Sequence, residues 1–157
     1  MNKTRAVLIA ACMFFMAVTP SHATGAHAKA LWVWDFYASA STLEKRNELV
    51  QFAAEHHINL LFIGINNTLR DQPSDYESLI RKAHQNGIRV FALAGKAEWA
   101  LENRHEDALN QVREVIAYNA NHPSETFDGI QLDIEPHKMS GFFFDTERIG
   151  KQFLQTL

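Results

Sequence analysis

Apolar runs alternate with amphipathic stretches along the chain, and this alternation predicts strands followed by helices. The apolar runs predict four strands, at residues 31–36, 59–65, 88–94 and 127–135. Apolar residues at helical spacing predict helices at residues 41–57, 74–86, 106–119 and 146–157. The run at 59–65 is almost continuously apolar, as expected for a parallel strand that is covered on both faces. The pattern therefore predicts an α/β fold with a parallel sheet.

Side-chain spacing also predicts helix ends and buried faces. Two Ser–Glu pairs have the spacing of a capping box and predict helix starts: Ser41 with Glu44, and Ser74 with Glu77. Asn86-Gly87 predicts a helix stop. Leu109, Val112 and Ile116 lie at helical intervals and predict the buried face of the helix at 106–119.

The fourth predicted strand ends in carboxylates. Because strand side chains alternate between two faces, one face is apolar and contains Ile130, Leu132 and Ile134. The other face is polar and contains Gln131, Asp133 and Glu135. The Cα atoms of Asp133 and Glu135 are expected to lie roughly 6–7 Å apart. Two acids at the end of an apolar strand lose solvation energy, so we predict that they serve catalysis or ligand binding.

This segment resembles the fourth-strand motif of family-18 glycoside hydrolases, the chitinase-like group, which reads Asp-x-x-Asp-x-Asp-x-Glu. It runs here from Asp128 to Glu135, with Gln131 in place of the middle Asp. The resemblance implies a (β/α)₈ TIM barrel in which Glu135 is the general acid. It also implies that Asp133 assists by orienting an N-acetyl group of the substrate, which acts as the nucleophile. Asp128 and Gln131 are then candidates for substrate binding.

A complete barrel needs about 250 residues, more than this chain of 157 has. The four predicted β/α units amount to about half a barrel. We therefore expect residues 29–157 to be the N-terminal half of a TIM-barrel catalytic domain, in a truncated chain. The alternative is a small open parallel α/β sheet.

In barrels and open sheets alike, ligands bind at the carboxyl ends of the strands. Further candidate substrate-binding residues at those ends are Trp34, Asp35, Asn66 and Trp99. Carboxylates and amides bond to hydroxyl groups, and indole rings pack on apolar sugar faces. This combination predicts a carbohydrate substrate.

The N-terminus has the features of a signal peptide. Lys3 and Arg5 precede an apolar stretch at residues 6–18, and small residues allow cleavage after Ala23 or Ala28. The apolar stretch is shorter than the roughly 20 residues that span a bilayer, so no stable membrane anchor is expected. Residues 1–28 therefore predict export, to the periplasm or outside the cell. The alternative is a lipoprotein attached through Cys12.

The composition argues against several classes of function. The chain has 15 Lys and Arg against 18 Asp and Glu and no basic stripe, which argues against nucleic-acid binding. Cys12 is the only cysteine, and it lies in the predicted leader, which excludes thiolate chemistry from the mature chain. The eight histidines are scattered, so no metal site and no cofactor are expected. A metal site on Asp133, Glu135 and His137 is the alternative.

The sequence thus predicts an exported glycoside hydrolase-like protein that cleaves a polysaccharide or oligosaccharide. The first alternative is a carbohydrate-binding barrel without catalysis, or an inactive fragment. The second alternative is a metal-assisted hydrolase on a similar sheet.

Overall fold

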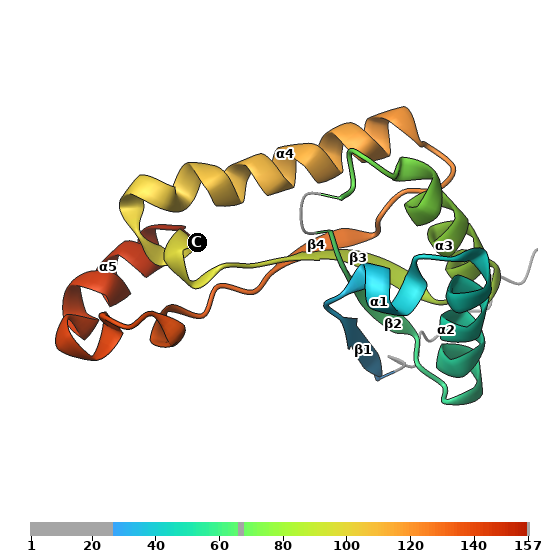
Figure 1. The fold of residues 1–157 in the computed structure, drawn as a ribbon, viewed down its shortest axis with the longest axis horizontal. Coiled ribbons are helices and arrows are strands. Elements are labelled where there is room, and N and C mark those ends of the chain that lie inside the picture. Colours follow the sequence, from blue (N-terminus) through green and yellow to red (C-terminus); the bar gives the residue numbers. More distant parts are fainter. Residues whose placement is uncertain (1–26, 66–67, 157) are drawn as a thin grey trace, which may run out of the picture.

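The computed structural model describes residues 27–65 and 68–156 (Figure 1). Most of the predicted signal peptide, with Cys12, and the candidate residue Asn66 lie outside the described residues. Four strands form one parallel sheet in the order β1-β2-β3-β4. The strands are β1 (Ala30–Val33), β2 (Leu60–Gly64), β3 (Arg89–Ala94) and β4 (Gly129–Leu132). The predicted α/β fold with a parallel sheet is confirmed, and the described sheet is open rather than closed into a barrel.

Helices follow the strands in the chain. They are α1 (Phe36–Ala40), α2 (Leu43–Glu55), α3 (Pro73–Gln85), α4 (His105–Asn121) and α5 (Thr146–Thr156). Short 3₁₀ turns lie at Ala97–Ala100, Glu102–Arg104, Pro136–Lys138 and Phe142–Phe144. Figure 1 shows α1, α2 and α3 at one end of the molecule and α5 at the other, with the long α4 extending between them. No helix in the described part of the chain is long and apolar enough to cross a membrane.

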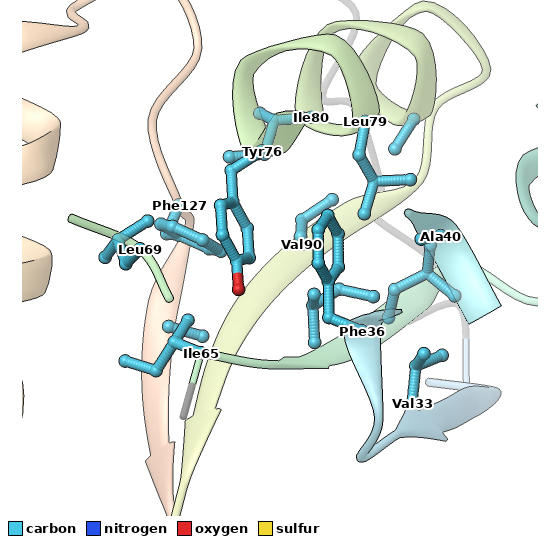
Figure 2. Close-up of a cluster of buried hydrophobic side chains, with 14 of the residues drawn as sticks. Val33, Phe36, Ala40, Ile65, Leu69, Tyr76, Leu79, Ile80, Val90 and Phe127 are labelled. Carbon is cyan, nitrogen blue, oxygen red and sulfur yellow. The ribbon is translucent and has the colours of Figure 1, made fainter. Parts of the chain in front are cut away.

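The main core lies between the sheet and the helices at the end of the molecule that holds α1 to α3. Tyr76 of α3 is fully buried there, and its ring stacks on Phe36 with the ring centroids 4.2 Å apart (Figure 2). The Tyr76 hydroxyl donates to the carbonyl of Gly64 at 3.1 Å and is hydrogen-bonded to the hydroxyl of Thr68. Apolar burial on this scale is the dominant stabilising term of the fold.

Helix starts differ by one or two residues from the predicted ones. The Thr42 hydroxyl accepts from the amide of Lys45 at 3.2 Å, so Thr42 rather than Ser41 caps α2. Helix α3 begins at Pro73, which places Ser74 inside the first turn. Proline fits this position because backbone N–H groups in the first turn of a helix have no acceptor within the helix, so the N–H that proline lacks costs no hydrogen bond. The predicted stop is confirmed, since α3 ends at Gln85 and Gly87 adopts a φ of 69°.

The first strand is shorter than predicted and ends at Val33. The reason is that a carboxylate oxygen of Asp35 accepts from the amide of Ala38 at 2.9 Å and starts α1. The helix turns Phe36 into the core, where only 3 % of the residue is exposed. The predicted continuation of the strand through Phe36 is therefore wrong.

The buried face of α4 also differs from the predicted one. Leu109 and Ile116 are 47 % and 63 % exposed. The buried residues of the helix are Ala108, Gln111, Val115 and Tyr118. The ring of Tyr118 packs against Phe127, with centroids 5.2 Å apart, and this large contact outweighs the smaller aliphatic side chains in setting the helix rotation.

The second face of the sheet is aromatic. Trp32, Phe62 and Phe91 are neighbours in the register of β1, β2 and β3, with centroids 4.6 Å and 5.7 Å apart. Gly129 continues the row on β4, where a Cβ would lie 2.8 Å from the Phe91 ring. Trp32 is 43 % exposed. This face therefore presents a continuous aromatic layer to its surroundings.

Candidate functional site

The carboxylate-rich segment begins as strand β4 and continues beyond it. Ile130, Leu132 and Ile134 pack against the main core, which confirms the predicted apolar face. The amide of Asp133 donates to the carbonyl of Ala94 at 2.8 Å, one residue past the end of the strand. Gln131 pairs in register with Leu93, so the polar alternate residues lie on the aromatic side of the sheet.

Gly95 allows the ends of β3 and β4 to approach closely. A Cβ atom built on Gly95 would overlap the carbonyl oxygen of Asp133. Only a residue without a side chain fits this contact. The close approach fixes the residue that follows, Lys96, beside Asp133.

A pocket of about 390 Å³ lies where the ends of β1, β3 and β4 meet. It is lined by Trp34, Gly95, Lys96, Ala97, Asp133, Glu135 and Lys138. Three of the residues predicted from sequence therefore share one pocket: Trp34, Asp133 and Glu135. The lining thus includes two acids, two lysines and a tryptophan, which suits a polar ligand with an apolar face.

Glu135 is paired with a lysine and lies near a histidine. The Lys138 ammonium donates to one carboxylate oxygen of Glu135, and Nε2 of His137 lies 3.7 Å from the other. The side chain of Glu135 is 30 % exposed, whereas those of Lys138 and His137 are 62 % and 60 % exposed. The hydrogen bond to Glu135 raises the pKa of Lys138, so this lysine is held in its charged form.

The turn that carries Lys138 follows directly from Glu135. Pro136 starts a 3₁₀ turn, and the amide of Lys138 donates to the carbonyl of Glu135 at 3.0 Å. Lys138 is a residue of the pocket that was not predicted from the sequence. A signal was present, because a proline directly after the predicted strand favours a turn that brings residues three apart together.

The other predicted residues lie elsewhere. Asp35 caps α1, and Trp99 is only 4 % exposed within the core. The Gln131 amide donates to the carbonyl of Leu132 at 3.1 Å. Asp128 lies at the opposite end of β4, where one oxygen accepts from the amide of Val90 at 2.7 Å. The structure thus separates the first acid of the segment from the last two.

A larger pocket, of about 600 Å³, lies on the helical side between the start of α3 and α4. Its one acid, Glu114, is ion-paired with Arg70, and its floor includes the buried Tyr118. Strand ends do not reach it, so its size does not make it the better candidate for catalysis. Among the described residues, no group of three His, Cys, Asp or Glu side chains could hold a metal ion.

Comparison of the chain with protein-family models, with curated proteins and with solved structures gives no match. We therefore infer function from the pocket itself.

Proposed function

We propose that this chain is part of an exported glycoside hydrolase and forms the first half of a (β/α)₈ barrel. The sequential order of four parallel strands supports this, because it is the order of a barrel. The aromatic face of Trp32, Phe62 and Phe91 would then be the barrel interior. Strands β1 and β4 are both edges of the described sheet, and in a closed eight-stranded barrel each of them would pair with a further strand.

The observation that carries the proposal is that Asp133, Glu135 and Trp34 line one pocket at the carboxyl ends of the strands. Glu135 would donate a proton to the glycosidic oxygen as the bond to C1 breaks. Water would supply the hydroxyl group to C1, and its remaining proton would restore Glu135. Asp133 would orient the substrate, and Trp34 would pack on a sugar face.

A second candidate is a barrel that binds carbohydrate without cleaving it. The ion pair between Glu135 and Lys138 favours this reading, because an ionised carboxylate accepts hydrogen bonds from sugar hydroxyls but has no proton to donate. The two candidates use the same pocket and differ in what Glu135 does.

The test is turnover of β-linked oligosaccharides by the full-length protein and by its Glu135→Gln variant. We expect the substitution to lower kcat by about a hundredfold or more while binding persists. Glu147→Gln, at an exposed position on α5, is the matched control and should retain activity. Equal turnover by Glu135→Gln would overturn the general-acid role. Saccharide binding without turnover by the unmodified protein would favour the binding barrel.

A further inference from the structure

We propose that the saccharide bound at this site carries a carboxylate group, which Lys138 and Lys96 bind. The inference rests on the proposed function and adds the class of substrate. It starts from two lysines that line the same small pocket as the two acids.

The backbone of Lys96 is fixed on both sides. Gly95 is pressed against the carbonyl of Asp133, and the amide of the buried Trp99 donates to the carbonyl of Lys96 at 3.2 Å. Within the described residues, the Lys96 ammonium makes no ion pair. Lys96 thus lines the pocket from a backbone that is fixed on both sides, and an anionic ligand group would pair with its ammonium.

The second cation, Lys138, is engaged with Glu135. This pair needs Glu135 ionised, whereas general acid catalysis needs it protonated. A substrate carboxylate that draws Lys138 away would leave Glu135 without its close cation. Glu135 can then take a proton from solvent and pass it to the glycosidic oxygen. A neutral sugar offers Lys138 no competing anion and leaves the pair intact.

The charge balance of the pocket leads to the same conclusion. Lys96 and Lys138 offset Asp133 and Glu135 when both acids are ionised. Protonating Glu135 leaves one positive charge in excess, and a carboxylate on the substrate neutralises it. An acidic saccharide therefore suits the protonation state in which the acid works.

The experiment measures the affinity of the full-length protein for matched pairs of β-linked trisaccharides. One arm compares glucose and mannose trimers with the same trimers oxidised to uronic acids at C6. A second arm compares an N-acetylglucosamine trimer with the same trimer bearing a lactyl ether carboxylate. Comparing the two arms shows whether the site prefers a uronic acid carboxylate or a lactyl carboxylate. In at least one arm, we expect the acidic trimer to bind about tenfold more tightly than its neutral match. This difference in affinity should shrink as salt is added.

The variants Lys96→Gln and Lys138→Gln should each reduce the preference for the acidic trimer several-fold, and the double variant should abolish it. Lys151→Gln is the matched control, because Lys151 is an exposed lysine on α5 that pairs with Glu147. Circular dichroism checks that each variant is folded.

Equal affinity for neutral and acidic trimers would overturn the inference and leave the proposed function standing. An acidic preference that survives in the double variant would also overturn it. If neither neutral nor acidic trimers bind, the proposed function fails and the inference with it.

Discussion

Nε2 of His84 lies 2.9 Å from a carboxylate oxygen of Asp128, so α3 is tied directly to the start of the carboxylate-rich segment. The same oxygen accepts from the amide of Val90 at 2.7 Å, and the amide of Asp128 donates to the carbonyl of Val90 at 2.8 Å. Asp128 therefore joins β3, β4 and α3 at the amino end of the sheet. Its contacts are those of a residue that holds the fold together.

Replacing Asp128 should weaken folding. Asp128→Ala removes the acceptor for both the His84 ring and the amide of the buried Val90, and we expect it to lower the free energy of unfolding by about 2 kcal/mol. Asp128→Asn is the milder control, because its amide oxygen can still accept from Val90. Urea denaturation measures both. A large rise in KM with unchanged stability would instead assign Asp128 to the substrate.

Tyr76 should make the free energy of unfolding fall as the pH rises above about 10. Burial raises the pKa of Tyr76 to about 12, whereas an unfolded tyrosine ionises near about 10. Between these values the unfolded chain loses a proton that the folded chain keeps, so the free energy of unfolding falls as the pH rises. We expect a loss on the order of 2 kcal/mol from this residue, measured by denaturant titration at a series of pH values.

Two variants isolate that contribution. In Tyr76→Phe the alkaline loss should shrink, and it should not vanish, because burial also raises the pKa of Tyr118. Tyr37→Phe, at a residue that is 39 % exposed, should reduce the alkaline loss far less than Tyr76→Phe does, because Tyr37 adds only a smaller charge effect to the pKa of Tyr76. An identical pH dependence in Tyr76→Phe and the unmodified protein would contradict the assignment.

The strands were predictable because burial requires long apolar runs, and all four expected runs contain a strand of the parallel sheet. The end of α3 was predictable because Gly87 takes a positive φ that other residues avoid. The end of β1 was not. Asp35 follows an apolar run without interruption, and nothing in the alternation shows that its side chain turns the chain into a helix.

The candidate site was predictable where strand geometry governs it. Alternation places Gln131 on the face opposite Ile130, and the chain continues to Asp133 and Glu135 in the pocket. Lys138 was missed because a 3₁₀ turn follows neither the helical nor the strand period. Trp99 was expected at the ligand, but its large ring gains more from burial in the core than from solvent contact.

The misassigned face of α4 yields a direct test. Val115 is 5 % exposed and its neighbour Ile116 is 63 % exposed, although the apolar spacing favours Ile116 as the buried residue. We expect Val115→Ala to lower the free energy of unfolding by about 1–3 kcal/mol and Ile116→Ala by less than about 0.5 kcal/mol. Thermal or urea denaturation distinguishes them. The reverse order would mean that α4 is rotated to bury Leu109 and Ile116.

Gly95→Ala should displace the strand ends that form the pocket. The added methyl group would overlap the Asp133 carbonyl, so the ends of β3 and β4 must separate, at an expected cost of about 1–3 kcal/mol. Asp133 would move with its backbone, and ligand affinity should fall together with stability. Gly150→Ala is the matched control, because a Cβ on Gly150 of α5 meets no atom within 4 Å. Alanine has the higher helix propensity, so this control should gain about 0.5–1 kcal/mol and leave ligand affinity unchanged. If Gly95→Ala were as stable as the unmodified protein, the strand ends could not be as close as the structure has them, and the placement of Lys96 beside Asp133 would fall with that contact.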